Sequence, residues 1–361
     1  MPFVGFQATH RGHNICCIAK APKKYKDVDE FWKGDYLRSV RDKMNAGVEI
    51  PECRACYKDE ADGKVSQRQR YNKLYESFQS EDLPTAMDLD FSNLCNLKCV
   101  MCGPDRSSQW VKELGLKEGN PALQNDQIDK LCAMSKNLKH ITIQGGEPSI
   151  MPEFEYYFDY LQQNDISKNI SVDCISNLTN INQKFYKMLE GFKQVNLNVS
   201  VDAYGDACNY IRFPSNFDKI SDNISRITKS NIQVNLQISL QVLSMFNFYD
   251  FLVWIHNKQQ SVDRKLGLQI TFVKQPDMLD IENAPSKLKD KFISDIIAFE
   301  NQYNLKHDLG FNMSIQNIKK TLQGTPTNTD KTKELLEYIH QIDTRRNIKV
   351  TNFIPNFHNF L

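Results

Sequence analysis

The sequence has no long hydrophobic run, no excess of one charge and no repeated or low-complexity tract. No stretch approaches the roughly 18 apolar residues that a membrane span needs, and residues 1–5 carry no basic or apolar signal-peptide region. We therefore expect a cytoplasmic protein without a membrane partner. Lysines and arginines number 45 against 44 aspartates and glutamates. This balance, without a basic stripe, argues against a nucleic-acid partner.

The sequence is instead rich in cysteine, with ten in 361 residues. In a cytoplasmic protein, so many cysteines favour metal binding or catalysis over disulfides. Two isolated cysteines, Cys132 and Cys174, lie in apolar surroundings that predict core positions, and Cys208 also stands alone. The other seven fall in two groups: Cys16, Cys17, Cys53 and Cys56, and then Cys95, Cys99 and Cys102.

From residue 86 onward, short β-rich runs alternate with helical stretches, which predicts βαβ units and a parallel sheet. Right-handed crossovers would wind the strands into a partial (β/α)6 barrel or an open sheet, so we expect an α/β fold. In either form the site lies at the carboxyl ends of the strands. The expected strands are 86–91, 140–144, 170–175, 195–201, 234–242 and 266–273.

Three regions are expected along the chain. Residues 1–80 have poor apolar periodicity and two cysteine pairs, which predicts a small cysteine-rich segment stabilised by a bound metal. Residues 81–280 form the barrel, and residues 281–361 a C-terminal helical extension. The end of this extension is polar, and its sequence predicts little beyond a helix over residues 332–342.

The strongest motif is a C-x3-C-x2-C loop that directly follows the first expected strand. Three thiolates on so short a loop suit a compact [4Fe–4S] cluster better than one zinc ion, and they leave one iron without a protein ligand. A catalytic metal centre needs such an open position. The sequence therefore predicts that Cys95, Cys99 and Cys102 are metal ligands and catalytic residues.

The segment Gly145-Gly146-Glu147 follows the second expected strand. Two glycines let the backbone approach a ligand closely, and a carboxylate there can accept hydrogen bonds from an ammonium group. Taken alone, the same residues fit a turn with an exposed glutamate equally well.

Two other functions stay open for this arrangement. One is a zinc-binding, non-catalytic module that recruits a protein or nucleic acid, although no fourth ligand is obvious. The other is an electron-transfer iron–sulfur protein, which usually has a tighter cysteine run and needs no large barrel. The position of residues 145–147 after the cysteine loop argues against the first of these.

With these motifs, residues 86–275 resemble the radical S-adenosylmethionine (SAM) superfamily. The resemblance implies a [4Fe–4S] cluster that chelates S-adenosylmethionine and cleaves it reductively to a 5′-deoxyadenosyl radical, which abstracts hydrogen from a substrate. One residue departs from the common pattern: Met101 stands where an aromatic residue often precedes the third cysteine. Its thioether can still pack on the adenine, and Gln241 is either a second adenine contact or a core residue.

The resemblance also implies binding roles for residues at the ends of later strands. Gly145–Glu147 would bind the methionine amino group, and Ser176 and Asn177 the ribose hydroxyls. Asp202 would lie near the ribose or the substrate, and Arg212 would pair with the methionine carboxylate through its forked guanidinium. Serine, asparagine and aspartate also favour caps and turns, so purely local roles stay open.

The early cysteines can supply four sulfur ligands. Cys53 and Cys56 form a C-x2-C pair, and Cys16 and Cys17 lie upstream of it. Four such ligands suit zinc or a second iron–sulfur cluster. A redox dithiol is a further possibility, but the strand-then-helix context of such a site is missing.

Residues 12–72 resemble the twitch or SPASM type of auxiliary-cluster module, here placed before the barrel rather than after it. The resemblance implies an auxiliary [4Fe–4S] cluster held by Cys17, Cys53, Cys56 and either Cys16, His13, water or substrate. Adjacent cysteines bind one cube only with strain, so the fourth ligand stays open. Relatives of this type are oxidoreductase- or lyase-like enzymes that act on peptides or small metabolites and take electrons from a flavodoxin or ferredoxin.

Overall fold

Seven β-strands form a single sheet in which they follow one another in sequence order, from β1 to β7. The pairs β1–β2, β2–β3, β3–β4 and β6–β7 are parallel. This confirms the predicted α/β fold, an unclosed parallel sheet of the partial-barrel type. The structure is a computed structural model that describes residues 1–78, 82–117, 121–303, 309–323 and 331–361.

All six strands predicted from the sequence are present, within one or two residues of their expected bounds, and β1 precedes them. The strands are β1 (Gly5–Thr9), β2 (Ala86–Asp90), β3 (His140–Ile143), β4 (Ser171–Ser176), β5 (Gln194–Ser200), β6 (Gln233–Leu240) and β7 (Gly267–Phe272). The boundary expected at residue 80 lies outside the described residues.

The chain divides into two compact units. The first unit consists of Met1–Leu94, Glu118–Ile175 and Asn182–Asn196, and the second of Cys95–Lys117, Ser176–Ile181 and Leu197–Leu361.

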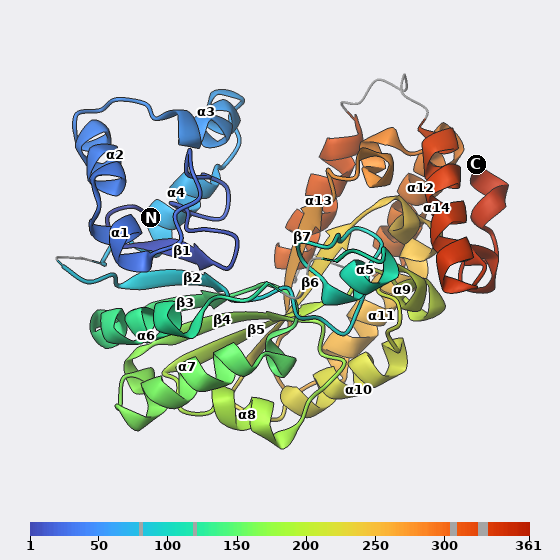
Figure 1. The fold of residues 1–361 in the computed structure, drawn as a ribbon. Helices are drawn as coiled ribbons and strands as arrows, with labels where there is room; N and C mark the ends of the chain where they lie inside the picture. The colour runs from blue at the N-terminus through green and yellow to red at the C-terminus, as the bar shows by residue number, and fades with distance from the viewer. Residues whose placement is uncertain (79–81, 118–120, 304–308, 324–330) are drawn as a thin grey trace. The chain divides into compact units, whose positions relative to one another are not determined.

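The first unit contains β1 and β2, which lie side by side at one end of the sheet, followed by β3 (Figure 1). Its buried aromatic core includes Phe91 and Phe154, whose stacked rings lie 4.5 Å apart, and Tyr157, which meets Phe91 edge to face. The helices are α1 (Val28–Lys33), α2 (Asp35–Asn45), α3 (Arg54–Ala61), α4 (Gln67–Leu74), α6 (Asn125–Met134), α7 (Pro152–Gln163) and α8 (Gln183–Leu189).

Strand β1 is the main difference from the sequence prediction. All five of its residues are buried, including the polar Gln7 and Thr9. Their burial is possible because both have partners: Asn14 donates to the Gln7 side chain, and the Thr9 hydroxyl donates to the Gly12 carbonyl at 2.7 Å. The N-terminal segment therefore adds a strand to the barrel sheet as well as carrying its cysteines.

The second unit contains β6 and β7, and alternate residues of β6 are buried, as expected for a strand with unequal faces. Its core includes Phe248 and Phe292, whose rings lie 4.5 Å apart. The helices are α5 (Ser108–Glu113), α9 (Gly205–Ile211), α10 (Phe217–Ile227), α11 (Phe248–Gln260), α12 (Ser286–Gln302), α13 (Leu309–Gln323) and α14 (Thr332–Arg346). Among the described residues, no helix has the length and apolar character of a membrane span.

The contact between β1 and β2 generates a stability prediction. A Cβ atom at Gly5 would lie 1.7 Å from the Ala86 carbonyl oxygen, so Gly5→Ala must displace one strand. We expect a loss of about 1–3 kcal/mol, typical of overpacking, measured by urea unfolding of the metal-free protein. Gly103→Ala is the control, because apart from its chain neighbours no described residue lies within 4 Å of its added Cβ. Equal unfolding midpoints for the two variants would contradict the tight β1–β2 contact.

Candidate functional site

The three cysteines of the strongest motif lie together in the second unit. Cys95 and Cys99 are buried, and Met101 and the half-buried Cys102 pack against them. The thiols of Cys99 and Cys102 are close enough to share a hydrogen bond, which raises the pKa of Cys99 and lowers that of Cys102. The loop thus presents three neighbouring thiols, and thiolate sulfur is the donor type that binds iron–sulfur clusters.

Backbone hydrogen bonds fix the middle of this loop. The Lys98 N–H donates to the Phe213 carbonyl at 2.7 Å, and the Val100 N–H donates to the Ile211 carbonyl at 2.8 Å. The Trp110 indole donates to the Cys99 carbonyl at 2.8 Å. Cys99 is therefore held by the segment at the end of α9 and by α5.

Arg212 directly follows α9, and the structure places its side chain beside Cys99. The Arg212 Nη1 lies 4.0 Å from the Cys99 sulfur, and its Nε lies 2.7 Å from a carboxylate oxygen of Asp202. Burial lowers the pKa of Arg212, but Asp202 and Cys99 outweigh it and raise that pKa above its ordinary value. Asp202 is itself fixed because it accepts the Ser239 N–H at 2.7 Å.

Asn177 and Ser176 make local contacts in the second unit. The Asn177 amide donates to the Asn96 side chain at 2.9 Å, so Asn177 is tied to the cysteine loop between Cys95 and Cys99. Asn177 also accepts from the Thr179 N–H and hydroxyl, and the Ser176 hydroxyl accepts the Leu178 N–H. These contacts supply turn and loop-holding roles, and a ribose contact stays a prediction.

Gln241 offers an unsatisfied polar group next to the loop. Its side-chain Nε2 lies 3.9 Å from the Met101 sulfur, while its buried Oε1 has no hydrogen-bond partner among the described residues. Within the described part of the chain, the buried Ser244 hydroxyl also has no hydrogen-bond partner. Orphaned buried acceptors in a folded protein call for an explanation. An adenine amino group is a suitable donor, so these residues fit the S-adenosylmethionine that the sequence predicts.

Gly145, Gly146 and Glu147 lie in the first unit, against the chain that leads into the cysteine loop. The Glu147 N–H donates to the Leu94 carbonyl at 2.8 Å, and Leu94 is covalently joined to Cys95. A Cβ at Gly146 would lie 2.1 Å from that same carbonyl oxygen. Only glycine permits this approach, which explains the residue type at that position.

Two features of the structure require a glycine at position 145. Gly145 has φ +124°, and an added Cβ would lie 2.7 Å from an Asp90 carboxylate oxygen.

The Glu147 side chain has no exposed surface and accepts the Ser149 N–H at 3.1 Å. An exposed turn glutamate, the alternative that the sequence left open, is therefore wrong.

The early cysteines approach one another in the first unit. Cys16, Cys53 and Cys56 are buried and Cys17 is exposed. A hydrogen bond from Cys17 lowers the pKa of Cys16 to about 7, and burial, Cys16 and Cys56 raise the pKa of Cys53 to about 11. The Cys17 sulfur lies 3.5 Å from the hydroxyl of Tyr71.

His13, one of the alternatives for a fourth ligand, uses one ring nitrogen in a contact with the backbone, and among the described residues its Nδ1 has no hydrogen-bond partner. Its Nε2 lies 3.1 Å from the Lys26 carbonyl, and burial lowers its pKa to about 4. Among the described residues, no three histidine, cysteine or acidic side chains gather closely enough to ligate one metal ion.

An ion pair at the end of β2 was not anticipated from the sequence. Asp90, the last residue of β2, has no exposed side-chain surface, and the Arg11 guanidinium lies 2.6 Å from it. His10 is buried beside the same carboxylate. A charged residue at the carboxyl end of a barrel strand is a signal for a site residue.

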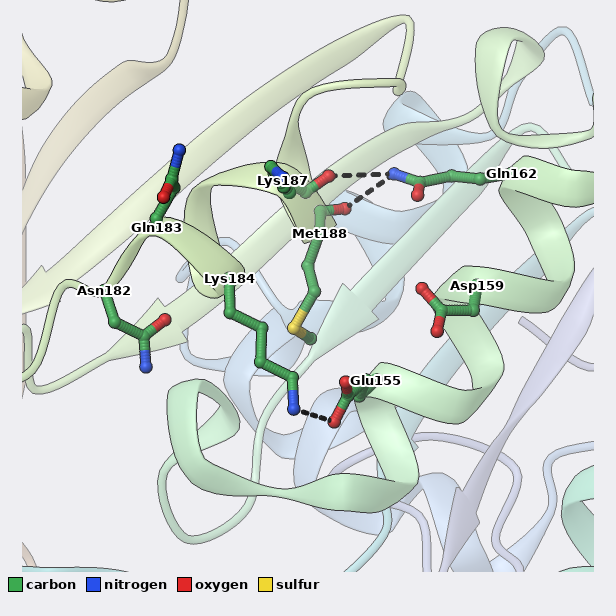
Figure 2. Close-up of a pocket in the computed structure, with 8 residues that line it drawn as sticks. All are labelled: Glu155, Asp159, Gln162, Asn182, Gln183, Lys184, Lys187 and Met188. Atoms are coloured by element: carbon green, nitrogen blue, oxygen red, sulfur yellow. Dashed lines mark hydrogen bonds and ion pairs between the residues drawn. The ribbon is translucent and has the colours of Figure 1, made fainter.

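A separate pocket lies between α7 and α8 in the first unit (Figure 2). Lys184 reaches across to Glu155 at 2.5 Å, and Gln162 donates to the carbonyls of Lys187 and Met188. None of the residues that line it was predicted as a site residue.

A comparison with models of protein families finds a match in the region of the predicted barrel. Residues 89–245 match the model of the "Radical SAM superfamily". No curated protein matches the chain.

Solved structures resemble the chain only distantly. Streptococcus suis SuiB bound to S-adenosylmethionine is 12% identical, with a TM-score of 0.43 over 76% of this chain and 60% of that one. TYW1 with a lysine–pyruvate adduct is 13% identical, with a TM-score of 0.40 over 74% and 89%. Methylornithine synthase is 12% identical, with a TM-score of 0.40 over 59% and 62%. This chain thus spans only about three fifths of SuiB.

The buried pair of Asp202 and Arg212 generates a prediction. Asp202→Asn keeps the shape and the acceptor for Ser239 but leaves Arg212 as an uncompensated buried charge. We expect a loss of about 3–5 kcal/mol in the metal-free protein, measured by urea unfolding. Asp206→Asn, which removes an exposed charge nearby on α9, is the control. If both variants unfold at the same urea concentration, Asp202 does not stabilise buried Arg212.

Proposed function

We propose, from the premise that residues 89–245 form a radical SAM superfamily domain, that this protein is a radical SAM enzyme. The observation that carries the proposal is the clustering of Cys95, Cys99 and Cys102 on one buried loop with Arg212 beside the middle thiol. Together they supply three sulfur ligands and a cation for an anionic group.

The three thiols would hold a [4Fe–4S] cluster. When bound, the cluster and S-adenosylmethionine supply the reductive cleavage that yields a 5′-deoxyadenosyl radical. The residues of this chain bind, orient and exclude water. Burial of Cys95 and Cys99 keeps solvent from the sulfur atoms, and the bonds of Lys98 and Val100 to the segment after α9 keep the ligands in register.

Several residues would bind S-adenosylmethionine. Glu147 supplies a buried carboxylate for its amino group, and Arg212 a guanidinium for its carboxylate. Met101 and Gln241 would meet the adenine, the first by packing and the second through its free Oε1. Asp202 orients Arg212 in this arrangement.

An auxiliary iron–sulfur cluster at the early cysteines is the second part of the proposal. Its support is the approach of Cys16, Cys17, Cys53 and Cys56 within the first unit, despite their separation in the sequence. Metal binding would deprotonate these thiols, and the metal–thiolate bonds would offset the cost of burying the thiolate charges. A twitch- or SPASM-like module of this kind would pass electrons or hold substrate.

The reaction type and partners follow from the same resemblance. We infer an oxidoreductase- or lyase-type reaction on a peptide or small metabolite in the cytoplasm, with electrons from a flavodoxin or ferredoxin. Substrate radicals form by hydrogen abstraction, so the substrate must reach the carboxyl edge of the barrel.

The enzymatic activity is tested by anaerobic purification. We expect a brown protein that forms 5′-deoxyadenosine from S-adenosylmethionine and dithionite, because the open iron binds the cofactor. Cys99→Ala should abolish this product, and Cys132→Ala, which changes another buried cysteine outside the motifs, should retain it. A colourless protein with stoichiometric zinc would instead establish the zinc-binding alternative. A brown protein without 5′-deoxyadenosine would leave only an electron-transfer role.

The auxiliary site is tested by iron content. Cys53→Ala should lower the iron per chain to about half, because one of two four-iron clusters loses a ligand. Cys132→Ala is again the control, and iron is measured by colorimetric assay alongside protein concentration. Unchanged iron in Cys53→Ala would refute an auxiliary cluster at these residues.

A further inference from the structure

The C-terminal helix α14 packs into the second unit through one face. Leu335, Ile339 and Ile342 are buried and recur at helical spacing, and Arg346 continues the same stripe. An apolar residue would be expected at the last of these positions, so the buried arginine needs a partner that explains it. The helix is drawn in red in Figure 1.

The partners of α14 are carbonyl groups of the cysteine loop. The Tyr338 hydroxyl donates to the Val100 carbonyl at 2.6 Å, and the Arg346 Nη2 donates to the Lys98 carbonyl at 2.7 Å. The carbonyl between them, that of Cys99, accepts from Trp110 at 2.8 Å. Three successive carbonyls around the middle cysteine thus each have a side-chain donor, two of them from α14.

The same contacts place an excess of positive charge beside the loop. The Arg346 Nε lies 3.2 Å from both carboxylate oxygens of Glu113, and the Lys98 ammonium lies 2.5 Å from one of them. The Arg346 side chain is fully buried and the Glu113 side chain is 3% exposed. Two cations therefore share one carboxylate, which leaves one positive charge uncompensated within this group.

Aromatic rings complete the surroundings of Arg346. Its guanidinium carbon lies 5.1 Å from the Trp110 ring and 5.3 Å from the Phe213 ring. Trp110 and Phe213 are also hydrogen-bonded to the loop, through the Cys99 carbonyl and the Lys98 N–H. A displacement of Arg346 would therefore disturb two of the groups that hold the loop around Cys99, Trp110 and Phe213.

We propose that Tyr338 and Arg346 are positioning residues of the cluster site. They hold the peptide groups on both sides of Cys99, and the excess charge of Arg346 and Lys98 over Glu113 raises the reduction potential of the cluster bound there. Cluster potentials depend on nearby charge, hydrogen bonds and solvent exposure. The effect on potential rests on the proposed function, whereas the holding of the loop does not.

Hydrogen exchange on the metal-free protein tests the holding of the loop. The amides of Lys98 and Val100 should exchange about fivefold faster in Tyr338→Phe and Arg346→Gln, which corresponds to the ~1 kcal/mol of one hydrogen bond. Arg345→Gln removes the same charge one residue away, on the exposed side of α14, and should leave exchange unchanged. Unchanged exchange in both Tyr338→Phe and Arg346→Gln would overturn the holding role.

The reduction potential tests the electrostatic part. EPR-monitored titration of the reconstituted full chain should give a more negative midpoint for Arg346→Gln than for the wild type or Arg345→Gln. The midpoint is taken from the EPR signal that changes when S-adenosylmethionine is added. Arg346→Lys keeps the charge, so its midpoint should stay near the wild type, and it provides a folded variant if Arg346→Gln is unstable.

Two results would overturn the electrostatic part. Equal midpoints for Arg346→Gln and Arg345→Gln would show that the buried charge has no special effect, as would a midpoint for Arg346→Lys shifted as far as that of Arg346→Gln. A wild-type chain that binds no iron–sulfur cluster would refute the proposed function and the effect on potential together. The exchange experiment would still decide whether α14 holds the loop.

Discussion

The loop from Cys95 to Cys102 forms neither helix nor strand, yet much of it is buried. A buried peptide group without a hydrogen bond costs about 1–3 kcal/mol, so an irregular buried loop needs donors and acceptors from other parts of the chain. Here the Ser108 hydroxyl bonds both the N–H and the carbonyl of Cys95, and Asn177 bonds Asn96. Much of the second unit can be understood as the set of partners that this loop requires.

Charge imposes a related constraint around the thiols. Arg212 and Arg346 are both buried, and each has a carboxylate within 3.2 Å, Asp202 in the first case and Glu113 in the second. Without those carboxylates, each cation would carry an uncompensated desolvation cost. Asp202 matches Arg212 one to one, but Glu113 is shared with Lys98. The environment of the thiols is therefore suited to stabilise additional negative charge.

Local patterns explain which features could be predicted from the sequence. Strands β2 to β7 carry apolar residues in runs or in alternation, which is a local pattern. Cys95, Cys99 and Cys102 lie within a single loop, so their spacing can be read directly from the sequence. Strand β1 was missed because it offers only two apolar side chains, Phe6 and Ala8, and the burial of Gln7 and Thr9 depends on hydrogen bonds to Asn14 and Gly12. The approach of Cys16 to Cys53 depends on tertiary structure, so the sequence predicted two pairs but not their geometry.

Arg346 illustrates a second kind of contact that could not be predicted from the sequence. Its main partner in the cysteine loop is the carbonyl of Lys98, and every residue has a carbonyl, so no pattern of residue types marks the contact in advance. The same holds for Tyr338 and Val100. Side-chain to main-chain bonds between distant segments are therefore the part of a site that sequence patterns reveal least, although they fix the ligands.

The contacts that sequence patterns do not reveal are unevenly distributed along the chain. The match to the radical SAM superfamily model spans residues 89–245, whereas β1, the early cysteines and α14 lie outside it. Buried polar groups that β1 and α14 add, such as Gln7, Thr9 and Arg346, therefore lie outside the matched segment. Arg11 and His10 at the end of β1, both in contact with buried Asp90, show that the added strand also brings ionisable groups to the carboxyl edge.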